Sequence, residues 1–142
     1  MAMFAKALVA DDDPDMRKWF RAVLRPLFAS IYDVSSGSDL LLSIAERGPF
    51  DLIVTDVRMP MPNGMSIVAM TRAAGVRTPF MVVTAMTDNW LQHSAAKLQD
   101  VVLLSKPLSV GRFVSQACVL LSVPGSVVVR ETGERMLGKD SI

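Results

Sequence analysis

Short apolar runs recur along the chain and alternate with longer segments in which apolar and polar residues are mixed. The runs are largely apolar and show no strict alternation, which is typical of strands that are buried on both faces of a parallel sheet. We predict five such strands, at residues 7–10, 30–34, 52–55, 80–83 and 101–104.

The segments between these runs have the spacing of amphipathic helices. In residues 14–27, apolar side chains recur every three or four positions, and Arg17, Arg21 and Arg25 lie four apart. Asp13 directly precedes this segment and suits the N-cap of a helix. Four further helices are predicted at residues 38–47, 63–74, 88–98 and 109–121. The last of them has one apolar face, formed by Val110, Phe113, Val114, Ala117 and Leu121.

Five strands that alternate with five helices predict the α/β class, a doubly wound five-stranded parallel sheet with helices on both faces. In such a sheet, ligands bind at the carboxyl ends of the strands. A Val-Pro-Gly sequence at 123–125 interrupts the helical pattern, so we expect one domain at residues 1–123. Residues 124–142 show no clear period and are expected to form a flexible tail or the beginning of a linker.

Composition narrows the class of protein. The 142 residues have a formal net charge of +1, which gives no broad basic field for direct binding of nucleic acid. The lone Cys118, which we place in the core, excludes an internal disulfide and favours a reducing compartment. No apolar run approaches the ~20 residues that span a bilayer, and residues 1–10 lack the pattern of a signal peptide. We therefore expect a cytoplasmic protein without a membrane-embedded segment.

Acidic residues directly follow two of the predicted strands. Asp11 and Asp12 follow the first strand and Asp56 follows the third. These strands are neighbours in a doubly wound sheet, so the carboxylates should meet at one edge. A cluster of carboxylate oxygens without a neighbouring His or Cys suits Mg²⁺. The single histidine, His93, has no acidic or cysteine partner at ligand spacing and is expected to be a structural residue at or near the surface.

A hydroxyl and an ammonium group follow two later strands. Thr84 comes after the fourth strand and Lys106 after the fifth, so the two form an anion-holding pair at the same edge. Three carboxylates are balanced by Mg²⁺ and Lys106, which leaves the site neutral before a phosphoryl group arrives. A carboxylate in this setting can act as a nucleophile toward phosphorus. The chain has no glycine-rich phosphate loop of the dinucleotide or P-loop kind.

Five short motifs occur in a fixed order along the chain, at residues 8–14, 53–60, 63–64, 83–85 and 105–107. Together they resemble the receiver domain of two-component response regulators, and the resemblance extends over about residues 6–121. It implies a flavodoxin-like fold with strand order 2-1-3-4-5. It also implies that the protein is a phosphoacceptor switch in a two-component phosphorelay.

The resemblance implies a phosphoacceptor and a metal site. Asp56 is the expected phosphoacceptor, and Asp11 and Asp12 are the acidic pair that holds Mg²⁺ together with Asp56. The backbone carbonyl of Arg58 is the remaining protein ligand of the metal. The expected chemistry is limited to Mg²⁺-dependent self-phosphorylation from a phosphodonor and self-dephosphorylation. We therefore expect a switch rather than an enzyme.

Two further residues have expected roles by the same resemblance. Thr84 is the hydroxyl that responds to phosphorylation, and Lys106, which precedes an expected cis bond to Pro107, contacts the phosphoryl group. Most members of the family have an aromatic residue three positions before this lysine, and this chain has Leu103 there. Readout through an aromatic side chain is therefore not expected.

The expected partners are a sensor histidine kinase or a histidine phosphotransfer protein, and an unknown downstream protein; a phosphorylation-dependent dimer is left open. Members of the family bind their kinases around the first helix, where the arginine stripe and Lys18 otherwise form a solvated face. Two alternatives remain. One is an Mg²⁺-dependent phosphohydrolase with an aspartate nucleophile, which needs either an acid/base carboxylate where Arg58 stands or a cap that encloses the substrate, for which the chain has no room. The other is a receiver-like binding module that works without phosphorylation.

Overall fold

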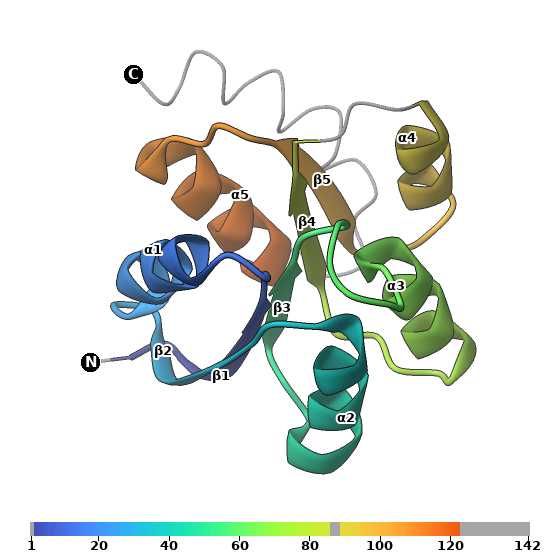
Figure 1. The fold of residues 1–142 in the computed structure, drawn as a ribbon. Coiled ribbons are helices and arrows are strands. Elements are labelled where there is room, and N and C mark those ends of the chain that lie inside the picture. The colour runs from blue at the N-terminus through green and yellow to red at the C-terminus, as the bar shows by residue number, and fades with distance from the viewer. Residues whose placement is uncertain (1, 86–88, 123–142) are drawn as a thin grey trace.

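The computed structural model describes residues 2–85 and 89–122, and strands and helices alternate through them (Figure 1). The elements are β1 (Phe4–Ala10), α1 (Pro14–Leu24), β2 (Phe28–Val34), α2 (Gly37–Arg47), β3 (Leu52–Thr55), α3 (Gly64–Ala73), β4 (Phe80–Thr84), α4 (Asn89–Ala96), β5 (Val101–Ser105) and α5 (Val110–Ser122). The predicted alternation of strands and helices is confirmed, with ends that differ by a few residues.

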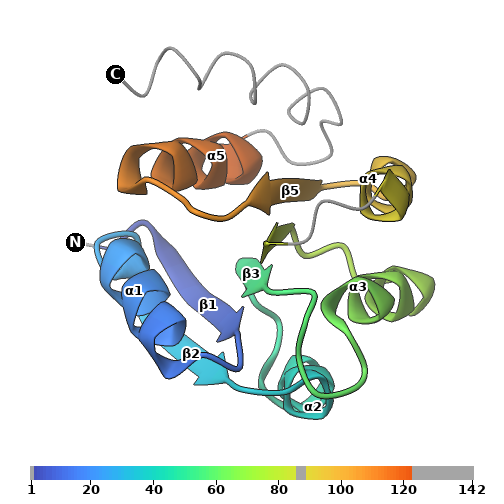
Figure 2. The same ribbon diagram turned by 45° about the horizontal axis from the view of Figure 1, so that its top comes forward.

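The strands form one parallel sheet in the order β2-β1-β3-β4-β5, which confirms the flavodoxin-like arrangement. Figure 2 shows α1 and α5 on one face of the sheet and α2, α3 and α4 on the other. Because the side chains of a strand point alternately to its two faces, each strand contributes to both cores. Ala7 and Val9 of β1 pack toward α1 and α5, whereas Leu8 and Ala10 pack toward α2, α3 and α4.

The strand at one edge of the sheet departs from the prediction. The sequence pattern indicates burial on both faces for all five strands, and this holds throughout β3 and β4. In β2, only Phe28 is fully buried, and Ala29, Ser30 and Asp33 are exposed. β2 lies at one edge of the sheet and contains the polar residues Ser30 and Asp33, which are exposed to solvent. The other edge strand, β5, has only apolar residues before Ser105 and is largely buried.

The first helix is shorter than predicted. The periodic pattern extends to residue 27, but α1 ends at Leu24. Pro26 has no N–H to continue the helical hydrogen bonds, and its ring would clash with the carbonyl of the preceding turn. Leu27 lies instead in the turn directly before β2, where its carbonyl accepts hydrogen bonds from the backbone N–H groups of Met3 and Phe4.

The buried face of α5 is also rotated from the predicted one. Phe113 and Ala117 are buried as expected, but the third fully buried apolar residue is Leu120, and Val110 is 51% exposed. Cys118, placed in the core from its sequence context, is exposed instead. Successive residues of a helix point about 100° apart, so Cys118 lies beside Ala117 in sequence but faces away from the core.

Among the described residues, no helix is both long enough and apolar enough to cross a membrane.

Candidate functional site

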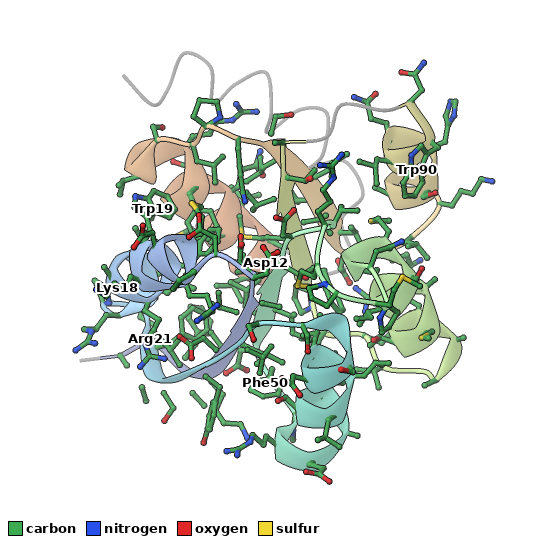
Figure 3. All side chains as sticks on the ribbon, in the orientation of Figure 1. Asp12, Lys18, Trp19, Arg21, Phe50 and Trp90 are labelled. Carbon is green, nitrogen blue, oxygen red and sulfur yellow. The ribbon has the colours of Figure 1, made fainter. Side chains whose placement is uncertain are left out.

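The polar residues of the predicted site lie at the edge where the parallel strands end. They directly follow β1, β3 and β5, or are the last residue of the strand in β4. Ala10 of β1 pairs with Thr55 of β3, so the next residues, Asp11 and Asp56, are neighbours across the sheet. The Asp56 N–H donates to the carbonyl of Ala10 at 3.0 Å, which extends this pairing into the loop. Figure 3 shows the adjacent Asp12 at the same edge, between α1 and the loop that leads into α3.

The carboxylates of Asp11, Asp12 and Asp56 form a compact cluster. One ligand oxygen from each lies within 4.8 Å of the other two. Asp11 and Asp56 are almost completely buried, whereas Asp12 is exposed to solvent. The predicted acidic group is therefore brought together, with an opening on the side of Asp12.

Lys106 lies against this cluster from the end of β5. Its Nζ donates to Asp11 Oδ2 at 3.1 Å and to Asp56 Oδ2 at 3.2 Å, and its side chain is 20% exposed. The peptide bond to Pro107 is cis, as expected. With three carboxylates and one ammonium, the cluster has a formal charge of −2, which a divalent cation would balance.

The ionisation of the site reflects burial and these contacts. Burial raises the pKa of Asp11 above its usual value, and hydrogen bonds from the Asp13 N–H and from Lys106 offset part of this effect. Burial alone would lower the pKa of Lys106. The hydrogen bond to Asp11 and the attraction of the Asp56 and Asp11 carboxylates outweigh that effect, so the pKa of Lys106 is raised. Lys106 therefore stays protonated and positively charged beside the carboxylates.

Backbone groups hold the two loops that contain the acidic residues. Asp11 Oδ1 accepts from the Asp13 N–H at 2.9 Å, and Asp13 in turn caps α1 by accepting from the Asp15 N–H. Asp56 Oδ1 accepts from the Arg58 N–H at 3.3 Å. The start of α3 lies so close to this loop that a Cβ on Gly64 would be 2.2 Å from the carbonyl oxygen of Asp56. A larger residue there would displace the backbone of Asp56.

Thr84 lies at the end of β4 and is almost completely buried. It lines a small cavity of about 150 Å³ together with Asp56, Arg58 and Ala85. Thr84 therefore adjoins the same cavity as Asp56, as the sequence predicted. Arg58, whose expected role is that of a backbone carbonyl ligand, also lines this cavity. The spacing of two residues from Asp56 is the signal that could have indicated it.

Two other predicted assignments agree with the structure. His93 is exposed on α4, as expected for a surface residue. Asp13 caps α1 and is not one of the clustered carboxylates. Arg17, by contrast, was interpreted as part of a solvated face, but its guanidinium donates to the backbone carbonyl of Asp11. The helical pattern does not reveal this contact, because the acceptor is a backbone atom in a loop.

The residues of the cluster fit a magnesium ion. The donors are carboxylate oxygens, and no His or Cys belongs to the group found among the described residues. Hard oxygen ligands of this kind are those that Mg²⁺ prefers, usually with several waters retained. Asp12 is exposed, so the mouth of the cluster leaves room for such waters.

Comparison with known proteins places the chain in a family. A family model for the response regulator receiver domain matches residues 7–117. The chain is 32% identical over 110 residues to the response regulator protein PilR of Pseudomonas aeruginosa, covering 75% of this chain and 24% of that protein. It is 31% identical over 123 residues to the transcriptional regulatory protein PrrA of Mycobacterium tuberculosis, covering 85% of this chain and 52% of that protein. This chain therefore spans about half or less of the length of these relatives.

Solved structures show the same fold. A response regulator receiver protein from Sinorhizobium medicae matches with a TM-score of 0.75 at 21% identity, covering 84% of this chain and 96% of that one. The response regulator protein TrrA from Thermotoga maritima, solved in complex with Mg²⁺-BeF, matches with a TM-score of 0.71 at 20% identity, covering 82% and 98%.

The family match spans both acidic loops, Thr84 and Lys106, and the strand order agrees with it. The chain thus belongs to the response regulator receiver domains, the phosphoacceptor switches of two-component signalling.

Proposed function

We propose that Asp56 is the residue that accepts the phosphoryl group, and that the donor is a phosphohistidine of a sensor histidine kinase or a histidine phosphotransfer protein. The observation that supports this most directly is the contact of Lys106 Nζ with both Asp11 and Asp56 inside a cluster of three carboxylates. Asp56 is also the carboxylate that lines the cavity shared with Thr84. An arriving phosphoryl group there would meet a nucleophile, a hydroxyl donor and a cation.

The transfer balances as a simple substitution at phosphorus. A carboxylate oxygen of Asp56 forms a bond to phosphorus as the bond from phosphorus to the histidine nitrogen breaks, and the imidazole keeps the electron pair. Lys106 offers hydrogen-bond donors to the phosphoryl oxygens, and Thr84 offers its hydroxyl. Hydrolysis later returns the carboxylate and releases inorganic phosphate, which limits the lifetime of the signal.

The proposed metal ligands are Asp11, Asp12, Asp56 and the backbone carbonyl of Arg58. Mg²⁺, when bound, would neutralise charge on the phosphoryl oxygens. The protein's own part is to hold the carboxylates together, which costs repulsion that Lys106 partly offsets. Within the cluster this lysine contacts two of the three carboxylates.

A pocket beside the site supports docking of a protein donor. It has a volume of about 440 Å³ and is lined by Met16, Trp19, Ala85, Lys106, Pro107 and Leu108, so it lies between α1 and the loop that follows β5. A partner helix seated there would bring its histidine toward Lys106 and Asp56.

We propose a cytoplasmic protein whose receiver domain comprises residues 1–123, with 124–142 as a tail or linker toward a downstream function. Residues 124–142 lie outside the described residues.

The test is the intact mass of the protein after incubation with a small phosphodonor such as acetyl phosphate and Mg²⁺. We expect one added phosphoryl group in the wild type and in Asp13→Asn, and none in Asp56→Asn. Asp13→Asn is a matched control, because it removes a neighbouring carboxylate that is outside the cluster while keeping a residue that caps helices well. Equal labelling of Asp56→Asn would contradict the assignment. Phosphorylation without added Mg²⁺ would contradict the role of the metal.

A second measurement addresses the metal ligands. Asp12→Ala leaves fewer anionic oxygens for an ion that gives up its waters reluctantly, so we expect Mg²⁺ binding and phosphorylation both to be lost. An unchanged Mg²⁺ titration in this variant would show that the metal binds elsewhere.

A further inference from the structure

The carbonyl group of Asp11 lies just beyond the end of β1, where the sheet no longer supplies it with a partner. The N–H of the same residue still donates to the carbonyl of Val34 in β2 at 3.2 Å. Beyond it the chain turns into the loop of Asp11 and Asp12. The orientation of the Asp11 peptide therefore depends on a hydrogen bond from outside the sheet.

Arg17 supplies that hydrogen bond from the second turn of α1. Its Nη1 donates to the carbonyl oxygen of Asp11 at 2.8 Å, and its Nε lies 4.0 Å from Asp33 Oδ2 on β2. The side chain is 23% exposed. One guanidinium thus spans from the loop of the acidic cluster to the edge strand, which a planar, forked cation can do and a single-point donor cannot.

Arg21, one turn further along α1, makes a comparable pair of contacts away from the site. Its Nη1 donates to the carbonyl oxygen of Ile31 at 2.8 Å and lies 3.8 Å from the same Asp33 carboxylate. Figure 3 shows Arg21 on the part of α1 that lies beside β2. The two arginines therefore share a helix face, a charge and an acidic partner, and differ in that Arg17 alone of the two contacts the loop of the acidic cluster.

We propose that Arg17 is a positioning residue for the metal site, which holds the Asp11 peptide so that the carboxylates of Asp11 and Asp12 converge with Asp56. This inference rests on the proposed function, because it concerns the same Mg²⁺ site. Arg17 does not contact the metal or the phosphoryl group. It acts through the backbone of a ligand residue, as outer partners of metal ligands commonly do.

The sign of the effect distinguishes positioning from simple electrostatics. A positive charge near a Mg²⁺ site repels the ion, so removing that charge should strengthen binding if charge is all that Arg17 contributes. Removing a positioning residue should weaken binding despite the loss of repulsion.

The experiment compares Arg17→Met with Arg21→Met in the full chain. Methionine keeps a long unbranched stem and a high helix propensity, so both variants retain α1. We expect Mg²⁺ to bind about tenfold more weakly to Arg17→Met, as followed by NMR amide shifts during titration. Binding to Arg21→Met should be unchanged or slightly tighter. Equal or tighter binding in Arg17→Met would overturn the proposal.

Arg17→Lys provides a second variant that keeps the charge and disturbs folding least. A positioning role predicts weaker Mg²⁺ binding than in the wild type, because lysine cannot reach both acceptors with a fixed fork. Binding equal to that of the wild type would contradict the role.

A metal-free measurement separates this inference from the proposed function. Asp13 N–H donates to Asp11 Oδ1, so its exchange with solvent reports on the orientation of Asp11 without any ion. We expect its exchange to be several-fold faster in Arg17→Met and unchanged in Arg21→Met. If the wild type binds no Mg²⁺, the proposed function fails, while the exchange rates still decide whether Arg17 positions Asp11. Equal exchange in the two variants would refute positioning.

Discussion

The helices beside the loops of the site differ in how many apolar side chains they pack into the core. On the face of α1 and α5, the rings of Trp19, Phe20 and Phe113 contact one another with centroids 5.3–5.6 Å apart, and both phenylalanines are fully buried. On the other face, α4 is a short helix of which Leu91 and Ala95 are the buried residues.

The residues of the site are attached to different helices of these two layers. The loop of Asp11 and Asp12 leads directly into α1, and Lys106 precedes α5. These three residues are therefore attached to the two helices that contain the packed rings. Thr84 ends the strand that leads toward α4, where Trp90 is 45% exposed. α1 and α4 each bury two apolar residues fully, but Met16, Trp19 and Val23 of α1 also pack partly against the core, and no further residue of α4 does so. Elements with fewer packed apolar side chains open more readily. We therefore expect α1 and α5 to keep their positions when Asp56 is phosphorylated, and α4 to be the helix that moves.

The largest expected loss of stability comes from a cavity between α1 and α5, where the three rings pack. Phe20→Ala removes a fully buried ring that contacts both Trp19 and Phe113, so we expect a loss of about 3–5 kcal/mol in the free energy of unfolding. Urea denaturation measures it. A loss below about 1 kcal/mol, far under the usual cost of such a cavity, would contradict tight packing of these three rings.

The next prediction compares one substitution in both layers. Leu24 on α1 and Leu91 on α4 are each fully buried, so Leu→Ala makes the same chemical change at both. We expect Leu91→Ala to cost about 2 kcal/mol, at the low end of the usual range, and Leu24→Ala to cost more. A short helix can collapse into part of the cavity that is left. The same denaturation experiment tests this, and a larger loss at Leu91 would reverse the comparison.

A smaller effect is expected at the cap of α1. Asp13→Ala removes the side chain that accepts from the Asp15 N–H, which should lower the free energy of unfolding by about 1 kcal/mol. Asp13→Asn should retain most of that stability, because asparagine also caps helices well. Thermal denaturation of both variants measures the difference. Equal losses in the two would show that the charge of Asp13, rather than its hydrogen bond, stabilises α1.

The smallest effect is expected on the outer face of α5. Cys118 is exposed, so Cys118→Ser should change the free energy of unfolding by less than about 0.5 kcal/mol. The neighbouring Ala117 is completely buried, and Ala117→Ser would place a hydroxyl in the core at a cost of about 1–3 kcal/mol. Similar values for the two variants would contradict the burial of Ala117 and the exposure of Cys118.

The sequence alone determined the elements, their order and the membership of the acidic site. Continuously apolar runs and helical spacing depend on local side-chain patterns, so the ten elements could be predicted to within a few residues. Because parallel strands end at one edge, positions just after strands were enough to bring Asp11, Asp12, Asp56, Thr84 and Lys106 together. No distance in the tertiary structure was needed for that grouping.

Only the tertiary structure decided which faces of the strands and helices are buried and which backbone carbonyls accept hydrogen bonds from side chains. The sequence pattern predicts β2 to be buried on both faces, but β2 lies at the edge and is only partly buried, and Cys118 is one helical step from the buried Ala117. Arg17 has the spacing of a solvated stripe, yet it donates to the Asp11 carbonyl. Each of these depends on how whole elements pack against one another, and a pattern of side chains along one element has no information about a neighbour's position or about a backbone acceptor in a loop.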